Sequence, residues 1–371
     1  MKPETVAAQA LHAIDEPTGA VVPPIHLATT YARDAAYASR GAIYTRDDNP
    51  TPQLAERVLA SLEAGAAALT FSSGMAAATA AIRAALRPGD HIISPRVAYY
   101  ALRSWLDRFC ARWGVAHDVV DTADLDAVRA ALRPTTRLLW IETPANPTWE
   151  LTDIAALAEL AHSVGARLAV DSTCATPVHS QPLALGADLV MHAATKDLAG
   201  HSDVLAGALV TRTADADWAQ IAELRHDEGP CLGPVEAYLL LRGMRTLFAR
   251  VERSSRTAQL LAEQLAGRGV HVRYPGLPSH PQHALARRQM QRGFGGMLSI
   301  QVGGGAARAL DVVRKLRIWV PATSLGGVES LVEHRATVEG PTTPTPPDLL
   351  RLSVGLEHEQ DLLDDLLSAL A

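Results

Sequence analysis

The chain contains 371 residues, carries a formal net charge of −6 and is 48% hydrophobic. This is the composition of a globular protein of two or three domains, and it argues against fibrous, disordered and dedicated nucleic-acid-binding proteins. No apolar run is long enough to cross a membrane, and three widely spaced cysteines form neither a disulfide framework nor a zinc motif, so we expect a cytoplasmic protein without a metal site.

The first predicted feature is an N-terminal arm. Residues 1–40 are polar and contain the pair Pro23-Pro24, which indicates an extended segment that clasps something else. A helix is then predicted to begin with Thr51 as its N-cap and Pro52 at its first position, and to stop near Gly65. Its apolar face holds residues that lie four positions apart, namely Leu54, Val58, Leu62 and Ala66.

Between residues 67 and 212, short apolar strands alternate with helices. Strands are predicted at 67–73, 91–95, 137–143, 167–173, 187–193 and 206–212, and helices at 74–86 and 154–165. This alternation predicts an α/β fold with a mostly parallel sheet that helices cover on both faces.

The pattern changes after about residue 230. A stretch with few breaks, from Val235 to about Gly267, predicts one continuous helix roughly 48 Å long. Three strands and two helices are expected after it, at 270–275, 295–302 and 349–357 and at 305–315 and 360–370. We therefore divide the chain into an arm (1–40), a large domain (41–230) and a smaller α+β C-terminal domain (231–371).

Lys196 is the first candidate catalytic residue. The chain has three lysines, Lys2, Lys196 and Lys315, and the other 31 of its 34 basic residues are arginine. Lys196 follows a predicted strand, at the sheet edge where open α/β proteins bind ligands, and small residues surround it. A lysine amine can lose its proton and form a Schiff base with an aldehyde, which an arginine cannot do. The alternative is a surface lysine that ends a strand.

Two further candidates lie at ends of predicted strands. Asp171 ends the strand at 167–173, a position from which a carboxylate holds the pyridine nitrogen of pyridoxal phosphate (PLP) protonated. Gly74 and Met75 begin a helix directly after a strand, so their backbone N–H groups form a candidate phosphate site. Each candidate also has a purely structural interpretation. Asp171 can cap a helix or loop, and Gly74 and Met75 can form an ordinary strand-to-helix turn.

Candidate anion-binding and stacking residues complete the set. Tyr44 and Arg46 point the same way from an extended segment and can grip a phosphate, unless the segment is only a solvated loop. Arg351 begins a buried-type strand, where it binds either a substrate carboxylate or a structural acidic partner. Tyr99 follows the strand at 91–95 and either stacks on the cofactor ring or packs in the core.

Taken together and in this order, these segments resemble the Cys/Met-metabolism family of PLP enzymes. The resemblance runs from about Thr18 to the C-terminus. It is carried by YTRDDNPT (44–51), SSGMAA (72–77), ETPANP (142–147), VDST (170–173), ATKDLAGHSD (194–203), LRGMRTL (241–247), YPGLPSHPQH (274–283), SLGGVESL (324–331) and RLSVGLE (351–357). It implies the type I fold of PLP-dependent transferases, with a mostly parallel, seven-stranded sheet.

The resemblance also assigns roles by position. Lys196 matches the Schiff-base lysine, and Tyr99 matches the tyrosine that stacks on the ring and assists proton transfer. Tyr44 and Arg46 match a pair that reaches the phosphate of a neighbouring subunit, which implies a dimer of active sites, usually within a tetramer. The remaining matches are Gly74, Met75 and Thr195 for the phosphate, Asp171, Thr173 and Asn146 around the ring, and Ser324 and Arg351 for the substrate carboxylate.

Three departures concern the substrate and the phosphate. Ala193 stands where the family usually has a phosphate-binding serine, Tyr100 to Leu102 replace a run of small residues, and Thr323 replaces a frequent glutamate beside the substrate side chain. The resemblance implies a PLP-dependent carbon–sulfur lyase or γ-replacement enzyme for cystathionine-type amino acids, with cystathionine lyase favoured. Synthesis from O-acylated homoserine, methionine γ-lyase-like elimination and cofactor binding without turnover remain as alternatives.

Overall fold

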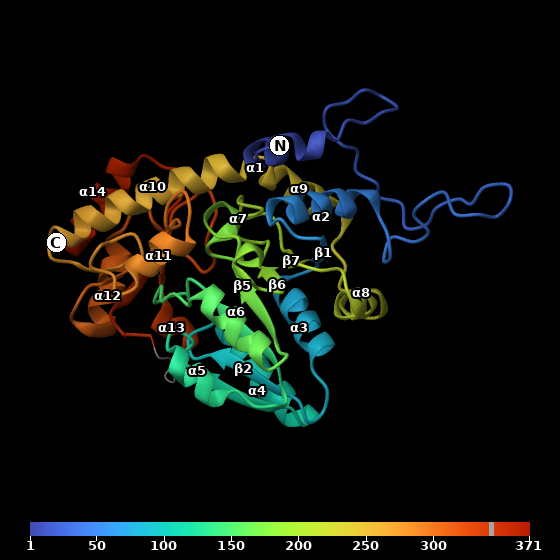
Figure 1. The fold of residues 1–371 in the computed structure, drawn as a ribbon. Coiled ribbons are helices and arrows are strands. Elements are labelled where there is room, and N and C mark those ends of the chain that lie inside the picture. The colour runs from blue at the N-terminus through green and yellow to red at the C-terminus, as the bar shows by residue number, and fades with distance from the viewer. Residues whose placement is uncertain (341–344) are drawn as a thin grey trace.

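The computed structural model describes residues 1–340 and 345–371, which build two sheets flanked by helices (Figure 1). The first sheet has seven strands in the order β1-β7-β6-β5-β4-β2-β3. β7 runs antiparallel to both of its neighbours, and the other pairs are parallel, so the predicted mostly parallel sheet is confirmed. The strands are β1 (Ala67–Phe71), β2 (His91–Pro95), β3 (Ala116–Val120), β4 (Thr136–Glu142), β5 (Arg167–Asp171), β6 (Leu189–His192) and β7 (Gly207–Thr211).

Helices cover both faces of this sheet because its strands are apolar on both sides. On β4, Leu138 and Trp140 pack on one face, and Leu139 and Ile141 pack on the other. The first face is covered by α3 (Gly74–Ala85), α4 (Tyr100–Trp113) and α8 (Ala216–Glu228). The second is covered by α2 (Pro50–Leu62), α5 (Leu125–Ala131), α6 (Ile154–Ser163) and α9 (Pro234–Met244), with the short α7 (Thr176–His179) and η2 (Pro182–Leu185) between strands.

The second sheet has five strands in the order β10-β11-β12-β9-β8 and is antiparallel except for the β10–β11 pair. Its apolar face packs against α10 (Leu247–Ala266), α12 (Gly305–Lys315) and α14 (Glu359–Leu370). The remaining elements are β8 (His271–Arg273), α11 (His283–Gln289), β9 (Met297–Gln301), β10 (Val320–Pro321), β11 (Leu331–His334), α13 (Arg335–Glu339) and β12 (Leu349–Ser353).

The start of the chain differs from the extended arm that we predicted. Residues Pro3–Gln9 form α1, followed by η1 (Ala10–His12), because Val6, Ala7 and Ala10 pack into the core beneath α2 and α9. Only the segment between η1 and α2 is extended, and it loops away from the body of the molecule (Figure 1).

Two helix boundaries also differ. The side chain of Asn49 accepts a hydrogen bond from the backbone N–H of Thr51, so α2 begins at Pro50 with Asn49 as its cap, and not with Thr51. The long helix predicted at 235–267 is two helices, α9 and α10, which are separated at Arg245 and Thr246. Among the described residues, no helix combines the length and apolar character needed to cross a bilayer.

Candidate active site

A cavity of about 200 Å³ opens at the carboxyl ends of β4, β5 and β6. Parallel strands place their carboxyl ends at the same edge, so residues far apart in sequence meet there. The cavity is lined by eight of the predicted site residues: Gly74, Met75, Tyr99, Asn146, Asp171, Thr173, Thr195 and Lys196.

The N-terminus of α3 forms one end of the cavity. Ser73 caps the helix, since its hydroxyl accepts a hydrogen bond from Ala76 N at 3.1 Å. In the described part of the chain, the N–H groups of Gly74 and Met75 have no hydrogen-bond acceptor, as expected in a first helical turn. A Cβ on Gly74 would lie only 2.9 Å from Ala193 Cβ, so the absence of a side chain lets the turn pack closely on β6. These amides suit an anion.

Thr195 lines the same end, but its hydroxyl is engaged elsewhere. Its Oγ1 donates a hydrogen bond to Ala206 O and accepts one from Ala206 N, both at 3.0 Å. The proton that we expected to face a phosphate therefore points to the backbone in this conformation.

Asp171 ends β5 deep in the cavity. The backbone N–H and the hydroxyl of Thr173 donate hydrogen bonds to its Oδ1 at 3.0 and 2.5 Å, and Ala193 N donates to the Thr173 hydroxyl at 2.8 Å. Within the described residues, Oδ2 of Asp171 accepts no hydrogen bond and remains available to a donor in the cavity. Burial raises the pKa of Asp171, and the two hydrogen bonds from Thr173 oppose this rise.

Asn146 and Tyr99 lie on the wall beside Asp171. The Asn146 Oδ1 atom is buried and has no partner among the described residues, so it too is free to accept a hydrogen bond from a ligand. The Tyr99 ring is 40% exposed and meets the ring of Tyr100 edge-on at 5.1 Å. Burial of its hydroxyl raises the pKa of Tyr99, which keeps the phenol protonated.

Lys196 reaches across the cavity to the loop before β11. Its Nζ donates a hydrogen bond to Ser324 Oγ at 2.7 Å. Burial lowers the pKa of Lys196, and the nearby guanidinium of Arg351 lowers it further. Both causes increase the fraction of neutral amine, the form that acts as a nucleophile or base.

Arg351 is joined to the same loop and to a buried acidic partner. Its Nη2 donates to Ser324 O at 2.5 Å, and its Nη1 lies 2.8 Å from Glu333 Oε2. Glu333 also pairs with Arg335, whose guanidinium lies 5.4 Å from the Tyr100 ring. The structural ion pair that we considered for Arg351 is therefore present, and Arg351 lies beside the cavity and does not line it.

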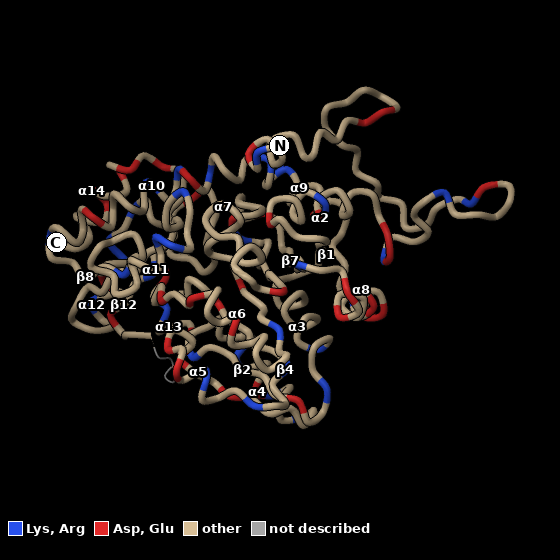
Figure 2. Tube along the Cα trace, viewed as in Figure 1, with Lys and Arg blue, Asp and Glu red and all other residues tan. Residues whose placement is uncertain are grey.

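Three other predicted residues lie away from this cavity. Thr323, which we expected beside the substrate side chain, is exposed to solvent. Tyr44 and Arg46 are each more than 40% exposed. Arg46 lies beside Gly229, which follows α8, and Asp47 pairs with His226 of α8. Figure 2 shows the segment between η1 and α2 passing close to α8. The guanidinium of Arg46 lies 5.4 Å from the centre of the Tyr44 ring, so the two side chains remain together.

The structure adds cavity residues that the sequence analysis did not identify. They are Ser73, Ala78, Glu142, Cys174, Met191, Leu205 and Leu325. Leu102 and Ala193, which we noted above as departures from the family pattern, also line the cavity. Glu142 was within reach of sequence reasoning because it ends a predicted strand next to Asp171, whereas no pattern singled out Leu205 or Leu325.

Known proteins match this chain over nearly its whole length. Cystathionine gamma-synthase of Mycobacterium tuberculosis is 48% identical, covering 99% of this chain and 96% of its own length. L-methionine gamma-lyase of Pseudomonas putida is 40% identical, and the match covers 95% of this chain and 93% of the lyase.

The structure of cystathionine gamma synthase from Xanthomonas oryzae pv. oryzae in complex with cystathionine superimposes with a TM-score of 0.96 at 38% identity. That match covers 100% of this chain and 98% of the other, which confirms the type I fold. A family model described as Cys/Met metabolism PLP-dependent enzyme matches residues 4–371. The chain therefore belongs to the Cys/Met metabolism family of PLP-dependent enzymes.

Proposed function

We propose that this protein catalyses γ-replacement, in which the thiol of cysteine displaces the carboxylate leaving group of an O-acylated homoserine to give cystathionine. The proposal is carried by the mycobacterial relatives named cystathionine gamma-synthase, which share 44–48% identity with this chain, whereas the relatives named as lyases share 38–41%. The Xanthomonas oryzae pv. oryzae synthase, at 38%, lies in the range of the lyases. Elimination from cystathionine or methionine is the second candidate, and the lyases among the relatives favour it.

The cavity has the groups that PLP requires. We assign its phosphate to the N–H groups of Gly74 and Met75, its ring nitrogen to Asp171 Oδ2 and its ring hydroxyl to Asn146 Oδ1. The two side-chain atoms have no partner in the described residues, and the absence of a Gly74 side chain allows the turn to pack on Ala193. Bound PLP supplies an aldehyde and an electron-withdrawing ring that makes protons of the amino acid removable.

Lys196 is assigned as the nucleophile and then as the base that moves protons at Cα and Cβ. Its lowered pKa supports both roles, since the neutral amine has a free electron pair. Ser324 holds the amine at 2.7 Å, which orients Lys196 before the substrate binds. Tyr99, whose raised pKa keeps the phenol protonated, is assigned to stack on the ring and to deliver a proton.

Arg351 is assigned to bind the α-carboxylate of the substrate. Its Nε is buried and has no partner among the described residues, so a donor remains for a carboxylate even with Glu333 in place. Glu333 then fixes the orientation of the guanidinium.

The function is tested by product analysis. The purified, PLP-loaded protein is incubated with O-succinyl- or O-acetylhomoserine, with and without cysteine, and separately with cystathionine or methionine. γ-Replacement predicts cystathionine only when both substrates are present, at a rate above the release of ammonia and 2-oxo acid. Faster release of ammonia from cystathionine or methionine would replace the proposal by the lyase function.

We further propose that the active sites are completed in a dimer by Tyr44 and Arg46 of the neighbouring subunit. The segment between η1 and α2 leaves the body of the molecule and exposes apolar side chains, including Val21 (74%), Leu27 (68%) and Tyr37 (78%). A projecting segment with several exposed apolar side chains fits a partner surface that covers them.

Mixing variants tests this arrangement. R46A and K196A, each inactive alone, are unfolded together and refolded as a mixture. A shared site predicts that about a quarter of wild-type activity returns, since half of the random dimers carry one intact site of two. Absence of recovery in verified mixed dimers would place Arg46 in the site of its own chain.

A further inference from the structure

Glu142 is a buried carboxylate whose contacts connect two loops of the active site. It is the last residue of β4 and is 8% exposed. It pairs in register with Asp171 on β5, and it lines the same cavity as Lys196.

The two oxygens of Glu142 are used separately. Oε2 accepts a hydrogen bond from the backbone N–H of Tyr99 at 2.8 Å, and Oε1 accepts one from the backbone N–H of Asn146 at 3.0 Å. Tyr99 belongs to the loop after β2, and Asn146 belongs to the loop after β4. A single side chain therefore holds the backbone at the two residues assigned to the ring face and the ring hydroxyl.

This arrangement requires two acceptor oxygens on one side chain. A carboxyl group has both, with two lone pairs on each oxygen, whereas a glutamine has only one oxygen to offer. Burial and the adjacent charge of Asp171 raise the pKa of Glu142 to about 8, whereas the two backbone hydrogen bonds and Arg335 oppose the rise.

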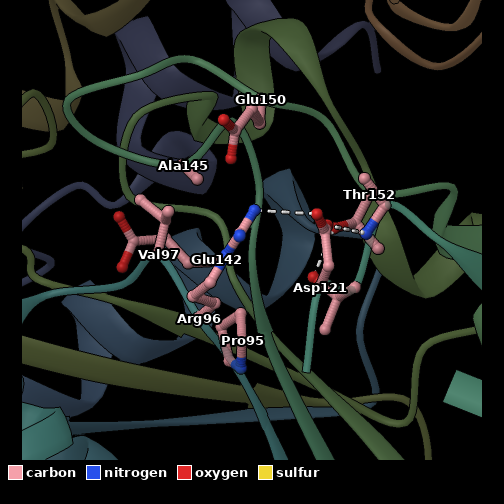
Figure 3. A pocket seen from close by; sticks show the side chains of 10 residues that line it. Pro95, Arg96, Val97, Asp121, Glu142, Ala145, Glu150 and Thr152 are labelled. Atoms are coloured by element: carbon pink, nitrogen blue, oxygen red, sulfur yellow. Dashed lines mark hydrogen bonds and ion pairs between the residues drawn. The ribbon is translucent and has the colours of Figure 1, made fainter. Parts of the chain in front are cut away.

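The back of Glu142 borders a second cavity, which has room for about one water molecule (Figure 3). Arg96, Asp121 and Glu150 also line it, and Arg96 pairs with Asp121 at 2.9 Å and not with Glu142. In the described part of the chain, Glu142 has no cationic partner in hydrogen-bond contact, so a charge-pairing role does not explain it.

We propose that Glu142 is a positioning residue, which sets the Tyr99 ring and the Asn146 amide against the cofactor ring by binding their backbone N–H groups. The inference rests on the roles proposed above for Tyr99 and Asn146. A displacement of such groups by about 1 Å lowers turnover up to 100-fold.

The first test measures amide hydrogen exchange of the cofactor-free protein, with E142Q compared to wild type. We expect exchange at Tyr99, Asn146 or both to accelerate at least about 10-fold, with the core strands unchanged. The matched control is E150Q. Glu150 lies in the loop after β4, as Asn146 does, and lines the same small cavity as Glu142, but its side chain bonds to neither the Tyr99 nor the Asn146 amide. Hydrogen exchange needs neither substrate nor cofactor, so it tests the role of Glu142 even if the proposed reaction is wrong.

The second test is a double-mutant cycle on kcat with E142Q and Y99F in the PLP-loaded enzyme. If Glu142 acts through Tyr99, E142Q lowers kcat about 10- to 100-fold in the wild type but much less in Y99F. Visible circular dichroism of the bound cofactor should change in E142Q and not in E150Q. If E142Q does not fold, E142D, which retains both carboxyl oxygens but is one methylene shorter, enters the same measurements.

Three results would overturn the proposal. Wild-type exchange at both amides would show that Glu142 does not hold them. Accelerated exchange throughout the sheet would show a general structural role. Equal losses of kcat from E142Q in the wild-type and Y99F backgrounds would show that Glu142 acts independently of Tyr99.

Discussion

Replacing Gly74 by alanine tests the phosphate end of the site. A Cβ at this position would lie 2.9 Å from Ala193 Cβ, 3.0 Å from Ala193 Cα and 3.2 Å from Met191 Cε. Carbon atoms pack best at about 3.5–4.0 Å, so the start of α3 and the end of β6 must separate by roughly half an ångström or more. Ala193 presents backbone as well as a methyl group, so a rotamer change cannot relieve the contact.

The expected cost is that of overpacking a tight contact, about 1–3 kcal/mol. If the displacement of the Gly74 and Met75 N–H groups weakens the free energy of phosphate binding by this amount, the dissociation constant of PLP rises about 5- to 150-fold. The assay is a titration of the cofactor-free variant with PLP, followed by visible absorption, with circular dichroism to establish that the protein is folded.

The double variant G74A/A193G is the matched control. It removes the methyl group that the new Cβ meets first, although the 3.0 Å contact with the backbone persists, so part of the affinity should return. A G74A protein that binds PLP as tightly as the wild type would refute the reasoning, and so would a double variant no better than G74A.

Three further predictions concern buried charges. E333Q leaves the guanidiniums of Arg351 and Arg335 without a shared counter-ion, and we expect a loss of about 3–5 kcal/mol in the free energy of unfolding, measured with urea; a loss below about 1 kcal/mol would contradict this. Burial raises the pKa of Asp197 to about 6 in the folded protein, so wild-type stability falls relative to D197N as the pH rises from about 4 to above 6. The difference, measured by thermal or urea unfolding, approaches about 3 kcal/mol at most, and a difference independent of pH would refute it. K196R keeps the charge but cannot lose its proton, so we expect a folded protein without turnover or the visible band of lysine-bound cofactor, and measurable turnover would remove Lys196 from its assigned role.

The meeting of Lys196, Asp171 and Gly74 was predictable because each follows or ends an apolar strand. Parallel strands bring such positions to one edge, whatever their separation in sequence. Tyr44 and Arg46 show the limit of this argument, since an extended segment outside the sheet has no neighbours that fix its position from sequence.

The break between α9 and α10 could not be predicted from helical periodicity, because the reason is a tertiary contact. Gly243 packs so closely on the loop after Lys196 that a Cβ would lie 2.2 Å from Ala199 O. Arg250 then donates to Gly243 O at 2.7 Å and to Asp197 O at 2.9 Å, which joins the helix ends to that loop.

The positions of Thr323 and Glu142 depend on the fold in a related way. Motif position placed Thr323 beside the substrate, but the chain turns at Ser324, whose φ is 86°, and Thr323 lies on the exposed side. Glu142 looked like any acidic residue at a strand end, and only the fold shows that two distant N–H groups converge on it.

The position of β7 has a consequence for the order in which the protein is made. Among the described residues, β1 pairs only with β7, whose residues follow it by about 140 positions, so the Gly74 turn cannot join the sheet until the ribosome has produced Thr211. The remaining strands can pair earlier, because each has a neighbour closer in sequence. We therefore expect a nascent chain that ends before residue 207 to remain unable to retain PLP, even though Lys196 and Asp171 are already present.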